Sequence, residues 1–167
     1  MQLLVVRHAI AEDREDFAKT GRDDGERPLT DEGVRKIKRG ARGLRWLVPK
    51  VDMLVSSPLV RARQTADILR KEYDLDEVVS APELEPEAPL ARVTAALARM
   101  TGDTIAVVGH EPQLSRLATY LVCGADQSAV ELKKGAACLI RFDGKPRRGG
   151  GLLVWAMSPK ALRGLAG

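Results

Sequence analysis

Both histidines of this chain follow an apolar run of strand-forming residues. His8 comes after residues 3–6 with Arg7 directly before it, and His110 comes two residues after the run 105–108. Ligands of open α/β sheets bind just outside the carboxyl ends of the strands, so we expect both imidazoles at one sheet edge. Two imidazoles beside an arginine predict a site that handles an anion, with His8 as a nucleophile toward phosphorus.

A further arginine, Arg61, is expected at the same edge. It falls in the first turn of a predicted helix that follows another strand, so three strands deliver side chains to one place. A phosphoryl group spreads negative charge over three oxygens, and its transfer is catalysed mainly by positioning and positive charge. A guanidinium binds two such oxygens at once, and a helix N-terminus itself favours an anion. The expected phosphate site is formed by Arg7, His8, Arg61 and His110.

A covalent route follows from the chemistry of imidazole. A neutral imidazole is a competent nucleophile when its second ring nitrogen is held as a donor, usually to a backbone carbonyl. His8 would take the phosphoryl group in a first step, and water would remove it in a second. The other three side chains would neutralise the transferring oxygens, so we expect no metal ion in the mechanism.

Other catalytic patterns are missing from the sequence. There is no G-x-x-x-x-G-K-[ST] phosphate loop. Neither Cys123 nor Cys138 is followed by an arginine at the sixth position, as a cysteine-based phosphatase loop requires. Two histidines without an H-E-x-x-H helix or a cysteine pair make no zinc pattern, and Ser56 and Ser57 lie in no G-x-S-x-G elbow.

Hydrophobic patterning predicts the elements that position these residues. The predicted strands are residues 2–7, 51–56, 77–80, 104–109, 136–142 and 151–157. The predicted helices are residues 30–47, 58–73, 89–100, 112–123 and 159–165. Strands that alternate with helices indicate an α/β fold, a three-layer α/β/α sandwich with a mostly parallel central sheet. The last two strands predict an antiparallel C-terminal part, and the length suits a single domain over residues 1–167.

Residues 11–27 connect the first strand to the first long helix. They are polar and contain two glycines, so we expect a long surface loop, and such loops often serve function. Arg27 closes the loop and is held extended by Pro28. Two interpretations of Arg27 stay open, pairing with a nearby carboxylate and binding substrate. Thr30 suits the N-cap of the helix that follows.

Composition sets further limits. The net charge of +4 suits an acidic or phosphorylated partner. Basic clusters at 61–63, 133–134 and 145–148 suggest nucleic acid, but no aromatic platform accompanies them, so a solvated surface is favoured. Two cysteines make no disulfide framework, which predicts a cytoplasmic protein. We expect no membrane association, because no stretch approaches the roughly 20 apolar residues of a span and the N-terminal run is too short for a signal peptide.

The candidate site residues also lie in motifs that are typical of a known protein family. The sequence resembles the histidine phosphatase superfamily, also called the phosphoglycerate mutase-like family, and is similar to its small SixA-type phosphohistidine phosphatase branch. The matching stretches cover nearly the whole chain and are Arg7-His8-Ala9, Arg27-Pro28-Leu29-Thr30, Ser57-Pro58-x-x-Arg61-Ala62, Pro82-Glu83-Leu84, Gly109-His110-Glu111-Pro112 and Trp155-Ala156-Met157-Ser158-Pro159. The combination of the Arg-His, Ser-Pro-x-x-Arg-Ala and Gly-His elements is specific.

The resemblance implies a function as well as a fold. It implies that His8 becomes phosphorylated, that the phosphate pocket is made by the residues named above, and that no cofactor takes part. It also implies the short form of the family, without the helical insertion that shapes substrate pockets in the mutases. An open pocket would suit phosphohistidine displayed on a protein partner, with inorganic phosphate as product.

The sequence departs from the family pattern beside the nucleophile. Ala9 stands where glycine is usual, Ile10 where an acidic residue is frequent, and no asparagine follows to contact phosphate. Larger members use a glutamate as proton donor, and Glu83 matches it by order along the chain. Glu83 and Arg27 therefore join the candidate residues.

Three other functions remain open at this stage. The first is a phosphatase or mutase for small phosphate esters such as sugar phosphates. The second is a phosphate-binding or phosphoprotein-binding module without turnover, which the intact His8 disfavours. The third is a nucleic-acid binder, which rests on the basic pI alone.

Overall fold

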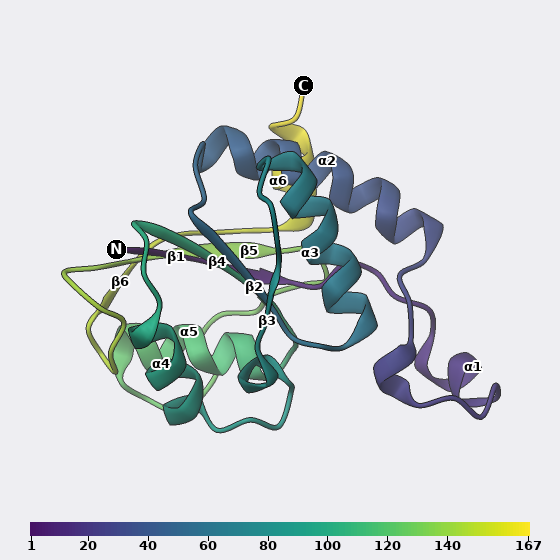
Figure 1. Cartoon of the computed structure of the whole chain (residues 1–167), viewed down its shortest axis with the longest axis horizontal. Coiled ribbons are helices and arrows are strands. Elements are labelled where there is room, and N and C mark those ends of the chain that lie inside the picture. The colour runs from purple at the N-terminus through teal and green to yellow at the C-terminus, as the bar shows by residue number, and fades with distance from the viewer.

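The apolar runs form one six-stranded sheet in the computed structural model, which describes residues 1–167 (Figure 1). The strand order is β3-β2-β4-β1-β5-β6. The strands are β1 (Gln2–Arg7), β2 (Met53–Ser56), β3 (Val79–Ser80), β4 (Thr104–Gly109), β5 (Ala137–Phe142) and β6 (Gly151–Met157). Strands β1 to β4 pair in parallel, whereas β5 and β6 pair antiparallel. The predicted mixed α/β sheet is confirmed.

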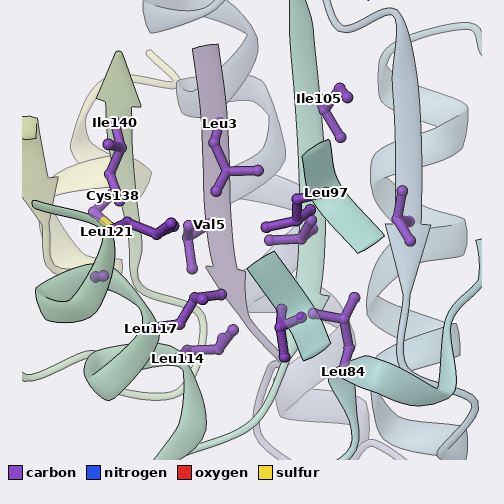
Figure 2. Packing of buried hydrophobic residues seen from close by; sticks show 14 of the residues in the cluster. Leu3, Val5, Leu84, Leu97, Ile105, Leu114, Leu117, Leu121, Cys138 and Ile140 are labelled. Atoms are coloured by element: carbon purple, nitrogen blue, oxygen red, sulfur yellow. The ribbon is translucent and has the colours of Figure 1, made fainter. Parts of the chain in front are cut away.

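Helices cover both faces of the sheet, as Figure 1 shows. One layer contains α2 (Asp31–Leu47), α3 (Val60–Glu72) and α6 (Pro159–Gly164), and the other contains α4 (Leu90–Arg99) and α5 (Gln113–Cys123). Side chains alternate along β1, so Leu3 and Val5 pack into the same core cluster as residues of α5, and Figure 2 shows Val5 near Leu117. Burial of both faces explains why β1 is a continuous apolar run. No helix has both the length and the apolar character to span a membrane.

The register of the central strands aligns the residues that follow them. Arg7 pairs with Gly109 in the parallel ladder. The ladder continues past the strand ends, because the His8 amide donates to the Gly109 carbonyl at 3.1 Å and the Ser57 amide to the Val108 carbonyl at 3.0 Å. Main-chain hydrogen bonds therefore fix the turns after β1, β2 and β4 at one edge of the sheet.

Three helices predicted to begin at a proline, α3, α4 and α5, begin one or two residues later, at Val60, Leu90 and Gln113, whereas α6 begins at Pro159 as predicted. Helix α2 begins as expected, with the Thr30 hydroxyl accepting from the Gly33 amide at 3.0 Å. Helix α3 begins at Val60 rather than at Pro58, because Leu59 is its N-cap and Pro58 lies in the turn after β2. Strands β2 and β3 are shorter than predicted, since main-chain pairing covers only their last residues.

Residues 11–27 lie at the surface as expected, but they are not a simple loop. The segment contains helix α1 (Arg14–Ala18) and a 3-10 turn, η1 (Asp24–Glu26). Asp13 caps α1 by accepting from two amides, and the Phe17 ring is buried. An antiparallel bridge between Ala11 and Leu29 joins the two ends of the segment. Local caps thus order a stretch whose composition alone indicates a loop.

Glycine 33 brings helix α2 against the chain that follows the first histidine. A Cβ atom on Gly33 would lie 2.0 Å from the main-chain oxygen of Ile10. No side chain fits there, so α2 and the Ala9–Ile10 backbone touch directly. This contact holds the segment after His8 in place.

Candidate active site

A polar cavity of about 410 Å³ opens at the carboxyl edge of the sheet. The four side chains expected to converge all line it, although they come from β1, from α3 and from the turn after β4. The ring centroids of His8 and His110 lie 5.1 Å apart, with the rings tilted by 52°. No hydrocarbon side chain of a core residue lines this cavity, so it suits a charged group rather than an apolar one.

His8 is held in a defined tautomer. Its Nδ1 lies 2.7 Å from the Ala9 carbonyl oxygen, which can only accept, so Nδ1 carries the hydrogen. Nε2 then holds the lone pair, and it makes no hydrogen bond within the protein. The ring is 5 % exposed. Burial, together with the smaller effect of the nearby arginines, lowers the pKa of His8 to about 3, so the ring is neutral at pH 7.

His110 is equally buried but differently bonded. Its Nε2 lies 2.8 Å from the Ser57 hydroxyl oxygen, and its Nδ1 is buried with no partner. Burial, together with the smaller effects of His8 and the arginines, lowers the pKa of His110 to about 3. A neutral ring that receives the Ser57 hydroxyl hydrogen at Nε2 presents Nδ1–H as a donor.

The two arginines at the site are anchored through their terminal nitrogens. Arg7 donates from Nη1 to the Leu132 carbonyl at 2.7 Å. Arg61 donates from Nη1 to the Asp24 carbonyl at 2.8 Å, and its Nη2 lies 3.2 Å from the Asp24 carboxylate. In both residues Nε is buried without a partner. Each guanidinium is therefore fixed in place with a donor left over for a ligand.

Arg27 also reaches the cavity, and it pairs with a carboxylate as one of its two interpretations expected. Its Nε donates to the Asp24 carboxylate at 2.9 Å, and its Nη1 donates to the Glu12 carbonyl at 2.8 Å. Its side chain is buried, yet it lines the cavity. Arg27 is thus paired with a carboxylate and placed beside the site.

Glu83 does not reach the cavity. It lies in the 3-10 turn η2 (Pro82–Leu84), in which Leu84 turns into the core. The Glu83 carboxylate lies 3.7 Å from Arg92 on α4, away from the histidines. Four residues further along, Glu87 lines the cavity instead. The segment that the order of motifs indicated therefore reaches the cavity, but through Glu87 rather than through Glu83.

Several cavity or supporting residues besides Glu87 were missed from sequence, and four of them bear on the chemistry. Glu111 and Lys134 line the cavity, Ser57 holds His110, and Asp24 pairs with the arginines. Glu111 and Ser57 carried a signal, because each lies at the end of a strand that delivers a site residue. Asp24 and Lys134 carried none, because only tertiary folding brings their segments to the sheet edge. No three His, Cys, Asp or Glu side chains are grouped as a metal site.

Comparison with known proteins agrees with this geometry. The family model "Histidine phosphatase superfamily (branch 1)" matches residues 3–88. An uncharacterised protein of Picosynechococcus is 34 % identical over 84 % of this chain and 85 % of its own length. The phosphohistidine phosphatase SixA of Escherichia coli is 27 % identical over 98 % of this chain and 97 % of its own.

Solved structures show the same fold. The protein histidine phosphatase SixA complexed with tungstate superimposes with a TM-score of 0.82 at 26 % identity, covering 97 % of this chain and 99 % of that one. The family-model match, the near full-length relatives and this structural likeness agree with one another. The chain belongs to the histidine phosphatase superfamily, in its SixA-type branch.

Proposed function

We propose that this protein is a phosphatase that acts on protein phosphohistidine through a phosphorylated His8. The observation that carries the proposal is the tautomer of His8. The hydrogen bond from Nδ1 to the Ala9 carbonyl leaves the Nε2 lone pair free beside a cavity lined with cationic and donor groups. This is the arrangement that an imidazole nucleophile requires.

The reaction takes place in two displacements. In the first, the Nε2 lone pair attacks phosphorus, and the bond from phosphorus to the substrate nitrogen breaks. The leaving imidazole keeps the bonding electron pair and takes up a proton. In the second, water attacks phosphorus and gives up a proton, the bond from phosphorus to Nε2 breaks, and inorganic phosphate leaves. His8 returns to its neutral form.

Three donors are free to bind the transferring group. They are the buried, unpartnered nitrogens Arg7 Nε, Arg61 Nε and His110 Nδ1. Phosphoryl oxygens would supply their missing partners and lose negative charge to two guanidiniums. One terminal nitrogen of each arginine already donates to a carbonyl, so little ordering remains to be done when substrate binds.

The proton donor in this proposal is Glu111 rather than Glu83. Glu111 follows His110 directly, lines the cavity, and has a buried Oε1 with no partner. Burial raises the pKa of Glu111, which favours the protonated form that can donate. The carboxylate of Glu83, in contrast, lies against Arg92 outside the cavity.

Phosphohistidine on a protein is the substrate class that the walls of the cavity favour. The walls of the cavity around the histidines are formed by residues of the segment 12–27, by Pro86 and Glu87, and by Lys134. No further part of the chain is placed to enclose a small metabolite. SixA of Escherichia coli, which matches over nearly its whole length, is a phosphohistidine phosphatase by name, and this similarity supports the same class here.

A substrate panel with intermediate trapping tests the proposal. The panel contains a phosphohistidine protein, sugar phosphates and p-nitrophenyl phosphate, each with labelled phosphorus where trapping is attempted. We expect the highest kcat/KM for the phosphohistidine protein and an acid-labile, alkali-stable label on the enzyme. A higher kcat/KM for a sugar phosphate would contradict the substrate class and favour the small-ester alternative.

The nucleophile has its own control. His8→Ala should abolish both turnover and labelling, a loss on the order of 10⁴-fold or more, while thermal unfolding stays cooperative. An active His8→Ala enzyme would falsify the covalent scheme. Tight phosphate binding by the intact protein without any turnover would instead identify a binding module.

A further inference from the structure

A second hollow shares one lining residue, Lys134, with the active-site cavity. It holds about 140 Å³ and lies between α2 and α6. Ala9 and Ile10, the residues directly after His8, form its inner end, and Lys134 lines both hollows. We call it the α2–α6 groove, after its main lining residues Ile10, Lys36, Ile37, Gly40, Lys134 and Arg163.

The groove is basic at its rim and apolar at its floor. Lys36, Lys134 and Arg163 line it, and no carboxylate does. Lys36 pairs with Glu32, but the pair is exposed and therefore weak, so the charge stays available to a ligand. The floor is made by Ile10 and Ile37. A groove of this kind complements a chain that carries carboxylates on an extended backbone.

A glycine in the middle of α2 keeps the floor open. Helix α2 contains three glycines, and close backbone contacts explain two of them. A Cβ atom on Gly33 would lie 2.0 Å from a backbone oxygen of another segment, and one on Gly43 would lie 1.9 Å from another. A Cβ on Gly40 would meet nothing closer than the Ile37 Cδ1 atom at 3.9 Å. Glycine costs a helix interior about 1 kcal/mol relative to alanine. Core packing does not require Gly40, whereas an open groove does.

We infer that the α2–α6 groove binds an acidic segment of the substrate protein next to its phosphohistidine. The inference rests on the proposed function, which it extends from the reacting group to the surrounding polypeptide. A substrate whose phosphoryl group reaches Nε2 of His8 must pass its flanking residues over neighbouring surface. Ile10 lies two residues from His8, so the groove begins within reach of those residues. Side-chain carboxylates would meet the three cations, and an apolar side chain would meet the floor.

Two synthetic peptides test the inference. Both carry one phosphohistidine and differ only in flanking residues, which are glutamates in one and glutamines in the other. We expect the wild-type enzyme to hydrolyse the glutamate peptide with at least about 10-fold higher kcat/KM, mainly through KM, and to lose this preference in 0.5 M salt. Equal kcat/KM for the two peptides would overturn the inference and leave the proposed phosphatase function standing.

Variants assign the preference to the groove. Lys36→Gln combined with Arg163→Gln removes two rim cations that do not line the active-site cavity. We expect this double variant to lose most of the glutamate preference and to keep p-nitrophenyl phosphate turnover within about 2-fold. Lys38→Gln combined with Arg42→Gln is the matched control, because it removes the same charge from a different hollow on α2. Equal effects of the two double variants would overturn the inference in favour of general attraction by net charge.

A filled groove gives a charge-independent test. Gly40→Leu should weaken binding of the glutamate peptide at least about 5-fold while α2 remains helical and thermal unfolding stays cooperative. Binding is measured by fluorescence anisotropy with unmodified histidine in both peptides, so the readout does not depend on turnover. If the enzyme binds the glutamate peptide more tightly but hydrolyses neither phosphopeptide, the proposed phosphatase function is contradicted, whereas binding of an acidic segment by the α2–α6 groove still stands. Equal binding of the glutamate and glutamine peptides would contradict the inference that the α2–α6 groove binds an acidic segment.

Discussion

The floor and the outer wall of the active-site cavity are built in different ways. The floor consists of His8 and His110, with Ser57 behind His110. These residues follow three neighbouring strands, and main-chain ladder bonds hold His8 and Ser57. The outer wall is the segment 11–27, in which the Asp24 carboxylate is the centre of ion pairs with arginines. Main-chain hydrogen bonds of the sheet therefore hold the floor in place, whereas side-chain ion pairs at the surface hold the wall in place.

This difference separates geometry from charge. Main-chain bonds position the nucleophile whatever side chains surround it, because the ladder needs no particular residue type. The wall adjusts the electrostatic field, since Asp24 offsets part of the positive charge of Arg27 and Arg61. Substitutions in the floor should therefore reduce catalysis strongly, and substitutions in the wall should tune it.

Arg61 links the two regions, and its loss should have the largest effect. Arg61→Ala removes a guanidinium from the phosphate site and a partner from Asp24. We expect kcat/KM to fall about 30- to 1000-fold. This corresponds to a loss of roughly 2–4 kcal/mol of transition-state stabilisation, the scale of a lost oxyanion-hole donor. The measurement is steady-state kinetics on the phosphohistidine protein. A loss below 3-fold would show that the floor alone binds the phosphoryl group.

The floor histidines make the stability of the protein sensitive to acid. Each has a folded-state pKa of about 3, below the ordinary 6.5, so the unfolded chain binds more protons between these values. Stability should therefore fall as the pH drops from 6.5 toward 3, by about 2 kcal/mol per histidine between pH 7 and pH 5. Urea unfolding at both pH values measures this loss. His8→Ala should reduce it by about half, and an unchanged loss would mean that the ring is not held neutral.

The carboxylates inside and outside the cavity give a matched pair. Glu111→Gln should lower kcat on a phosphate ester with a poor leaving group about 10-fold, because the proton donor is lost. It should spare p-nitrophenyl phosphate, whose leaving group needs no proton. Glu83→Gln should leave both substrates unchanged, since its carboxylate faces Arg92. Equal losses on both substrates would show that Glu111 supports the structure of the site rather than proton transfer.

Asp24 tests the wall, where we expect the smallest effect. Asp24→Asn keeps the main-chain carbonyl that holds Arg61 and retains an oxygen near Arg27, but removes the charge. We expect a change in kcat/KM of roughly 1 kcal/mol, or about 5-fold, as for a weakened charge-assisted hydrogen bond. Steady-state kinetics with the same phosphohistidine protein measures it. A loss as large as that of Arg61→Ala would mean that the wall positions the floor after all.

The sequence predicts the floor well for a physical reason. A parallel strand that is buried on both faces is a continuous apolar run, and its end is marked by the first polar residue. The ends of such strands share one edge, so Arg7, His8 and His110 could be assigned to a common site without coordinates. The strand Thr104–Gly109 has the predicted bounds, and the helix after Thr30 begins where its cap indicates.

The wall could not be predicted in the same way. The short helix α1 and the turn η1 depend on aspartate caps and on one buried ring, Phe17, within an otherwise polar stretch. The pairing of Asp24 with Arg61 joins positions that are distant along the chain. Glu83 and Glu87 differ only by the path of a proline-bounded turn, and which of them faces the cavity depends on how Leu84 enters the core.

The position of β1 has a consequence for biosynthesis. This strand leaves the ribosome before the others, yet its two neighbours in the sheet, β4 and β5, are among the later strands to be made. Strand β1 is apolar and needs a partner on each edge, so it stays unpaired until residues as late as Phe142 have been made. During that time it is prone to non-native association. His8 thus precedes both partners of its strand along the chain, and the site cannot form until β4 and β5 are available.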